Sequence, residues 1–306
     1  MDHSRRIAIA TASRSERGLL KPIIEAAKAR DDLEVHVITQ VINYDDEYGM
    51  FASSIQKTLE AIKPELILVP TDRIEMVWVA AVAYYLGIPV FHFLGGSSNT
   101  GTWDDLNRRV ISSYAYIIFC EDEAAKQRLI KSGEDPWRCI VTGTTHFDNM
   151  EIDLMLVPPG KQYDLVLINA NPADPEDTKS TVETTLRLID DTRLTFWIAP
   201  NEDTGRDLIL AAIPDRANLT ALPGVPRPQF LGLLKNCDRF LSNSSAGVYE
   251  GQHFIRPVVV NPGKRNLHRT WKHRGEYSTQ VGPKIAEILA TLPLGGVKLL
   301  KEYYRD

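Results

Sequence analysis

The stretch IAIATASRSERGLLKPIIEAAKARDDLEVHVI, residues 7–38, joins two short β-branched runs through a longer amphipathic run. We predict a strand over 7–12, a helix over 19–29 and a second strand over 33–38 from the change between the two hydrophobic periods. A strand, helix and strand in this order form a unit with parallel strands and a helix packed on one face. The stretch therefore predicts a parallel α/β fold.

The same alternation fills the chain on both sides of one break. Between residues 151 and 163 the pattern lapses into a segment with Pro158, Pro159 and Gly160. Further strands are predicted at 66–70, 89–93, 116–120, 139–141, 164–169, 194–199, 239–242 and 258–260, and further helices at 51–61, 73–86, 122–131, 175–189, 203–213, 226–236, 245–252 and 283–292. We predict two Rossmann-like, doubly wound domains, 1–155 and 156–306, facing across a cleft. The helix over 283–292 and another near the C-terminus are expected to cross back to the first domain.

Composition narrows the class of protein. The length of 306 residues suits two α/β domains, and a net charge of -5 argues against a free-standing nucleic-acid surface. Three widely spaced cysteines point to a reducing compartment, and no run reaches the roughly 20 apolar residues of a membrane span. We expect a cytoplasmic protein with no signal peptide and no membrane contact. The sequence leaves open whether it forms a homodimer.

Arg14 follows the first predicted strand in a turn of small residues before a helix. Backbone N–H groups at a helix start favour a phosphate, and an arginine adds a bidentate contact. An ordinary capped turn with a solvated arginine fits the same residues. We keep both interpretations for this turn.

Candidate acid and base groups follow the third and fourth strands. Asp72 is either such a group or the N-cap of the helix that starts at Arg73, with Arg73 and Glu75 as an ion pair at the helix start. His92 ends an apolar strand, where a structural histidine is the alternative to a catalytic one.

A polar loop follows His92 and leads into the next helix. Gly95 and Gly96 allow a ligand to approach the backbone, and the polar run beyond them suits a mobile substrate cover. Asp104 and Asp105 begin the next helix. Either aspartate serves the chemistry or only complements the helix N-terminus.

The strongest local signal is LSNSSAGVYE, residues 241–250. Ser244, Ser245 and the N–H groups beside Gly247 are predicted to bind a diphosphate, and Glu250 to accept hydrogen bonds from ribose hydroxyls. A glycine-containing packing turn is the alternative.

A second polar turn in this half of the chain is APNEDTG, residues 199–205. Asn201 and Asp203 are candidates for sugar or base contacts. Asp203 as a helix cap is the alternative.

Several segments together resemble the UDP-N-acetylglucosamine 2-epimerase family, especially its hydrolysing branch. They are SRSERGLLKP (13–22), DRIE (72–75), HFLGG (92–96), WDD (103–105), TGTTHFD (142–148), PNED (200–203) and NSSAGVYE (243–250). The resemblance covers most of the chain and implies the GT-B fold, with uridine diphosphate on the second domain and the hexosamine against the first.

The resemblance also implies roles for single residues. Arg14, Ser244, Ser245 and Glu250 would hold the nucleotide, and Asp72 and Asp104 would occupy the positions of the catalytic carboxylates. The implied reaction removes UDP and the proton on sugar carbon 2 to give a glycal, then adds water or UDP back with inverted configuration. The family needs no metal and no other cofactor.

Two positions depart from the family pattern. Leu94 stands where the family has a glutamate in its His-x-Glu-Gly-Gly segment, and Asn171 stands where it has a histidine before a proline. Within the epimerase hypothesis, His92 or His146 would substitute for a missing group. The departures also suit a GT-B glycosyltransferase that uses a nucleotide-sugar donor. A nucleotide-sugar binding protein without catalysis is the third hypothesis.

Overall fold

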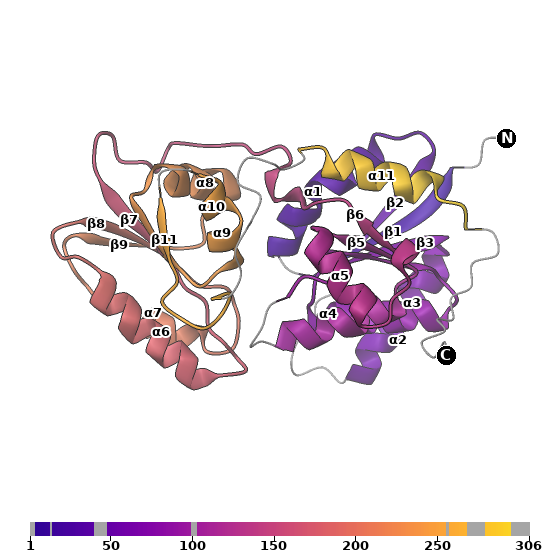
Figure 1. Ribbon diagram of the computed structural model, residues 1–306, viewed down its shortest axis with the longest axis horizontal. Helices are drawn as coiled ribbons and strands as arrows, with labels where there is room; N and C mark the ends of the chain where they lie inside the picture. Colours follow the sequence, from indigo (N-terminus) through magenta and orange to yellow (C-terminus); the bar gives the residue numbers. More distant parts are fainter. Residues whose placement is uncertain are drawn as a thin grey trace. The chain divides into compact units, whose positions relative to one another are not determined.

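Two compact units make up the chain (Figure 1). The computed structural model describes residues 4–12, 14–39, 48–98, 103–254, 257–267 and 279–294, without the side chains of Arg14, Ser15 and Tyr48. The first unit is Met1–Ser98, Asp104–Asn149 and Ser278–Asp306, and the second is Asn99–Trp103 and Met150–Tyr277. The chain passes into the second unit at residue 150, a few residues before the boundary expected from the sequence.

The first unit is built on a six-stranded parallel sheet in the order β2-β1-β3-β4-β5-β6. Its strands are β1 (Arg5–Thr11), β2 (Leu33–Thr39), β3 (Leu66–Pro70), β4 (Val90–Phe93), β5 (Ile117–Cys120) and β6 (Cys139–Val141). Each lies within one or two residues of the predicted strand, because buried parallel strands read as continuous apolar runs.

Helices cover both faces of this sheet. They are α1 (Arg14–Lys28), α2 (Tyr48–Ile62), α3 (Ile74–Tyr85), α4 (Trp103–Tyr114), α5 (Glu123–Lys131) and α11 (Val281–Thr291). Helices α2 to α5 share one apolar cluster with Ala8 and Ala10 of β1, whereas α1 and α11 share the other with Ile7 and Ile9. Successive side chains of β1 point to opposite faces of the sheet, so they contribute alternately to two separate apolar cores.

The last described helix, α11, returns to the first unit and lies beside α1 (Figure 1). A Cβ on Gly282 would lie 2.6 Å from the backbone of Pro22, so only glycine permits this close approach. The buried carboxylate of Asp148 accepts a hydrogen bond from the N–H of Gly282 at 2.6 Å and so caps the helix. Burial raises the pKa of Asp148, and the N–H groups of Gly282 and Val281 offset part of that rise. The second C-terminal helix predicted from the sequence lies outside the described residues.

The second unit repeats the plan with five parallel strands in the order β11-β10-β7-β8-β9. The strands are β7 (Tyr163–Leu167), β8 (Leu194–Ile198), β9 (Leu219–Leu222), β10 (Arg239–Ser242) and β11 (Val258–Val260), and the helices are α6 (Pro175–Leu188), α7 (Arg206–Ala212), α8 (Arg227–Asn236), α9 (Ser245–Val248) and α10 (Glu250–His253). Strand β9 was not predicted. It is a short edge strand whose two central residues, Thr220 and Ala221, are exposed, so it lacks an apolar run.

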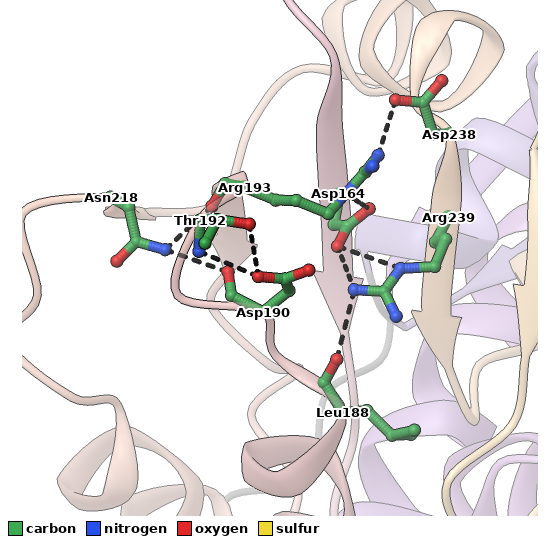
Figure 2. Close-up of polar contacts among 8 residues, drawn as sticks. All are labelled: Asp164, Leu188, Asp190, Thr192, Arg193, Asn218, Asp238 and Arg239. Carbon is green, nitrogen blue, oxygen red and sulfur yellow. Dashed lines mark hydrogen bonds and ion pairs between the residues drawn. The ribbon is translucent and has the colours of Figure 1, made fainter.

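Buried charge joins the amino ends of the strands in the second unit (Figure 2). Asp164 of β7, only 1% exposed, accepts hydrogen bonds from Nε of Arg193 at 3.2 Å and Nε of Arg239 at 3.0 Å. Arg193 also binds Asp238 at 2.7 Å. The carboxylate thus joins β7 to β10 and to the turn before β8, at the edge opposite the loops that follow the strands.

Each sheet has one point where the chain reverses its direction of winding. In the first unit the chain goes from β1 to β2 and then places β3 on the other side of β1; in the second it goes from β7 through β8 to β9 and then places β10 on the other side of β7. Loops at the carboxyl ends of the two strands beside such a point diverge, which leaves a crevice for ligands. The residues after β1, β3, β7 and β10 are therefore the first to consider. No described helix has the length and apolar character needed to cross a bilayer.

Candidate functional site

At the switch point of the first sheet, Glu16 links the ends of β1 and β3. Its buried carboxylate accepts a hydrogen bond from the N–H of Ala12 at 2.9 Å and another from the hydroxyl of Thr71 at 2.7 Å. Helix α1 already begins at Arg14, so the turn after β1 is shorter than the sequence suggested. The side chain of Arg14, our predicted phosphate contact, lies outside the described residues.

Asp72 follows β3 at the same edge and forms an ion pair with Arg108 of α4. The two side chains are 17% and 8% exposed. Arg108 also donates from Nη1 to the carbonyl of Leu94 at 2.9 Å, so one guanidinium connects the loops after β3 and β4. The N-cap of α3 is Arg73, not Asp72, so the alternative role as a helix cap is wrong for Asp72. The predicted Arg73–Glu75 ion pair is confirmed, at 3.2 Å.

His92 of β4 is fully buried, and both of its ring nitrogens are in hydrogen bonds. Nε2 lies 2.8 Å from the carbonyl of Thr71, which only accepts, so Nε2 carries the proton. Nδ1 then accepts from the hydroxyl of Ser112 at 2.9 Å. This is the geometry of a structural histidine, and a catalytic role for His92 stays a prediction that the geometry does not favour.

Asp104 and Asp105 lie in the first turn of α4, as expected, and both are partly buried. Asp105 lies 3.8 Å from Arg109, one turn further along the helix. The two glycines before this loop are explained by packing rather than by a ligand. A Cβ on Gly95 would lie 2.3 Å from the side chain of Ile118, and one on Gly96 would lie 2.4 Å from a backbone oxygen in α5.

Buried asparagines join the carboxyl ends of the strands in the second unit. Asn243, after β10, accepts a hydrogen bond from the N–H of Asn169 and donates one to its carbonyl, both at 2.8 Å. The side chain of Asn169 accepts from the N–H of Asn201 at 2.9 Å, and Asn266 donates to the carbonyl of Asn243 at 2.9 Å. The exposed Asn201, our predicted nucleotide contact, is thus fixed beside the switch point between β7 and β10.

The serine turn after β10 takes the predicted strand and turn form, but the helix predicted over 245–252 is divided at Tyr249 into α9 and α10. Ser244 is the N-cap of α9, and its hydroxyl accepts from the N–H of Ala246 at 3.3 Å. The N–H of Gly247 donates to the carbonyl of Ser244 at 3.0 Å, within the turn. Ser244 and Ser245 are both partly exposed, so their side chains are the groups of this turn that a ligand can meet.

Glu250 begins α10, six residues after Ser244, and its side chain is 2% exposed. Oε1 binds Arg227 of α8 at 2.7 Å, whereas Oε2 is buried with no partner among the described residues. A buried carboxylate oxygen without a donor is costly unless a ligand or water supplies one. Burial lowers the pKa of the neighbouring His253, against an opposing effect of the Glu250 charge.

Arg265, in the turn after β11, is a candidate that sequence reasoning missed. Its side chain is 15% exposed, and its guanidinium donates to the carbonyl of Ala170 at 2.9 Å and lies 3.6 Å from Asp203. Nε has no partner within the described part of the chain. The N-cap of α7 is Gly205, so Asp203 is not the cap considered above. Only the fold carries a residue after β11 across β10 to the end of β7.

Asn171 after β7 is fixed by the buried Asp177 of α6, which accepts from its amide at 3.0 Å and from the N–H of Lys264 at 3.0 Å. The amide carbonyl of Asn171 is buried without a partner among the described residues. This position therefore offers an acceptor, not the cation that a histidine can supply.

Comparisons with known proteins agree on one family. The family model for UDP-N-acetylglucosamine 2-epimerase matches residues 3–292. The chain is 25% identical to UDP-N,N'-diacetylbacillosamine 2-epimerase (hydrolyzing) of Legionella pneumophila, over 86% of this chain and 82% of the relative. It is also 25% identical to GDP/UDP-N,N'-diacetylbacillosamine 2-epimerase (hydrolyzing) of Campylobacter jejuni, over 87% and 82% of the two chains.

Solved structures show the same fold. UDP-GlcNAc 2-epimerase of Methanocaldococcus jannaschii, in complex with UDP-GlcNAc and UDP, matches with a TM-score of 0.76 at 18% identity, over 93% of this chain and 99% of that one. The Neisseria meningitidis enzyme bound to UDP-GlcNAc matches with a TM-score of 0.74 at 16% identity, over 94% and 92%. The predicted GT-B fold of two parallel α/β domains is confirmed, and the chain belongs to the UDP-N-acetylglucosamine 2-epimerase family.

Proposed function

We propose that this member of the family is a UDP-sugar 2-epimerase, hydrolysing or non-hydrolysing, that acts on UDP-N-acetylglucosamine or a similar UDP-hexose. The observation that carries the proposal is Glu250, a buried carboxylate with one oxygen paired to Arg227 and the other without a described partner. Two vicinal hydroxyls of a ribose are donors that suit such an oxygen. The serine turn directly before it suits the diphosphate of the same ligand.

The second unit supplies the nucleotide contacts in this proposal. Ser244 and Ser245 hold the diphosphate, and Arg265 adds positive charge from the turn after β11. Asn201 and the backbone beside Gly247 lie at the same sheet edge. Arg14, on the first unit, is the remaining predicted diphosphate contact. The positively charged side chains and the serine hydroxyls around the diphosphate would stabilise the charge that develops on UDP as it leaves.

The first unit supplies the proton transfer. Asp72 and Asp104 are the proposed acid and base groups for the proton on sugar carbon 2 and for the addition that follows. Loss of UDP from carbon 1 and of the proton from carbon 2 gives a glycal. A proton then returns to carbon 2 on the opposite face, which inverts that carbon, while water or UDP adds at carbon 1. The ion pair with Arg108 restricts rotation of the Asp72 side chain. A proton-transfer group that is already oriented in this way lowers the entropic cost of reaching the transition state. The proposed reaction uses no metal and no other cofactor.

The departures at Leu94 and Asn171 bear on the outcome of the reaction. Leu94 cannot move a proton, and the amide of Asn171 presents its carbonyl. The family match and the relatives favour an epimerase over the glycosyltransferase, the main alternative. We place the protein in the cytoplasm as part of the same proposal, supported by three buried cysteines that form no disulfide.

Turnover in deuterated water tests the proposal directly. Incubation with UDP-N-acetylglucosamine should place deuterium on sugar carbon 2, which mass spectrometry and proton NMR detect, whereas a transferase leaves that proton in place and requires an acceptor. The released products, UDP with free sugar or an epimeric UDP-sugar, then distinguish the hydrolysing from the non-hydrolysing outcome. UDP binding without any turnover, with or without acceptors, would instead identify a binding protein.

Two neighbouring aspartates give a matched pair of variants. Asp104→Asn should lower kcat by about a hundredfold or more, as removal of an acid or base group does, and leave the Kd for UDP nearly unchanged. Asp105→Asn, in the same turn of α4, should change kcat less than about threefold if Asp105 only complements the helix. Equal effects of the two changes would remove Asp104 from its proposed role.

Glu250 is tested through ribose recognition. Glu250→Gln should weaken UDP binding by about tenfold or more and should reduce the preference for UDP over 2'-deoxy-UDP, because the carboxylate accepts from the ribose hydroxyls. Isothermal titration with both nucleotides measures the two affinities. A preference that survives the substitution would contradict the contact.

A further inference from the structure

Thr71 has a backbone conformation that a threonine rarely adopts. Its φ is +53°, in the left-handed region, and it lies between the end of β3 and Asp72. Among the described non-glycine residues with positive φ it is the β-branched one; the others are Lys63, Leu94, Asn149 and Asn266. A β-branched residue at positive φ is strained, and such strain persists only where the surrounding structure over-determines the conformation.

Three hydrogen bonds hold Thr71 in place, two from strand β4 and one from helix α1. Its N–H donates to the carbonyl of Phe93 at 2.9 Å, and its hydroxyl donates to Glu16 of α1 at 2.7 Å. Its carbonyl accepts from Nε2 of His92 at 2.8 Å. Glu16 and His92 are 4% and 0% exposed, so both partners are fixed by burial.

The loop after the neighbouring strand repeats this arrangement. Leu94, at the end of β4, has a φ of +64°, and its carbonyl accepts from Arg108. Arg108 in turn forms the ion pair with Asp72. Thr71 and Leu94 thus follow adjacent strands, and a buried side chain binds the carbonyl of each. Asp72 is next to Thr71 in the chain and is paired with the arginine that binds Leu94.

We propose that Thr71 is a positioning residue for Asp72. The bond from its hydroxyl to Glu16 holds the backbone in the left-handed conformation, which sets the direction in which the next residue projects toward Arg108. His92 completes the clamp from the carbonyl side, which gives this histidine a task without proton transfer to a ligand. The inference rests on the proposed function, in which Asp72 is one of the two proton-transfer groups.

Three variants test the role of Thr71. Thr71→Gly removes both the strain and the hydroxyl, whereas Thr71→Ser keeps the hydroxyl. Lys63→Gly is the matched control, because Lys63 has a φ of +51° just after α2 and lies in an exposed position. Both glycine variants relieve a left-handed residue and add backbone freedom to the unfolded chain, so Lys63→Gly should shift Tm by only a few degrees. Thr71→Gly should lower Tm further, because it also removes a donor to the buried Glu16.

Kinetics should separate the two glycine variants. Thr71→Gly should lower kcat by about tenfold to a hundredfold, the range expected when a reacting group is misplaced by about 1 Å. Its KM and its Kd for UDP should stay within about twofold, because the proposed nucleotide contacts, except Arg14, lie on the second unit. Thr71→Ser should retain kcat within about threefold, and Lys63→Gly should match the wild type. A Thr71→Gly enzyme with wild-type kcat would overturn the proposal.

A crystal structure of Thr71→Gly gives a readout that does not depend on the substrate. We expect the Asp72 carboxylate to leave Arg108 or to become disordered, with the fold intact. An unchanged Asp72–Arg108 pair in this variant would overturn the positioning role, whatever the enzyme turns over. Absence of carbon-2 exchange by the wild type would instead count against the proposed function alone.

Discussion

Asp164→Asn is expected to destabilise the second unit strongly without affecting its proposed nucleotide site. Asp164 is 1% exposed, and its two oxygens receive Arg193 and Arg239, whose side chains are 26% and 29% exposed (Figure 2). The asparagine has nearly the same volume, so the change removes charge and not packing. It leaves the two guanidinium groups without their shared anion and presents an amide donor to one of them.

The size of the effect follows from burial. Removal of one partner from a buried ion pair typically costs about 3–5 kcal/mol. Both arginines here are about one quarter exposed and keep other contacts, Arg193 with Asp238 at 2.7 Å and Arg239 with the carbonyl of Leu188 at 3.1 Å. Water and these contacts offset part of the loss, so we expect about 2–4 kcal/mol. For a unit of this size the shift in Tm is about 10 °C.

Urea unfolding, followed by circular dichroism, measures the free energy, and titration with UDP measures the affinity. The affinity should stay within about twofold, because Asp164 lies about 16 Å along the strand direction from Asn169, at a rise near 3.3 Å per residue. Asp191→Asn is the control, since it breaks an exposed ion pair with Arg216 and should cost less than about 0.5 kcal/mol. A loss below about 1 kcal/mol for Asp164→Asn would refute the reasoning, as would a matching loss of UDP affinity.

Two further predictions concern titration. The raised pKa of Asp148 means that the folded state binds its proton more tightly than the unfolded state, so its contribution to stability is present at low pH and is lost as pH rises through the folded pKa. Relative to Asp148→Asn, the wild type should therefore lose stability in urea unfolding series as the pH rises above about 4, the usual pKa of an aspartate, and a constant difference would argue against the shift. The hydrogen bond with Cys139 and burial raise the pKa of Cys120 well above its usual range, and the other two cysteines are also buried. Iodoacetamide at mildly alkaline pH should leave all three thiols unmodified in the native protein and alkylate them in guanidinium, as mass spectrometry will show; rapid native alkylation of Cys120 would contradict this burial.

Much of the fold was predictable because each strand and helix of a parallel α/β unit has a hydrophobic pattern that neighbouring residues show in the sequence. The continuous apolar runs at 66–70 and 117–120 mark strands buried on both faces, and the lapse near Pro158 marks the passage between units. Strand β9 was not predictable in this way, since an edge strand with exposed central residues has no such run. The start of α1 was placed too late, because RSER carries no apolar residue although α1 begins there.

The sequence by itself determined the two doubly wound units, the family and the short set of polar residues that follow the strands. Each of these depends on residues that are close together in the chain, or on their order. Only the tertiary structure decided which of those residues meet: Asp72 with Arg108, Thr71 with Glu16 and His92, and Arg265 with the end of β7. These partners are 21 to 95 residues apart in the chain. Strand order and burial, which local propensity does not encode, bring these partners together and place both ring nitrogens of His92 in hydrogen bonds with protein groups.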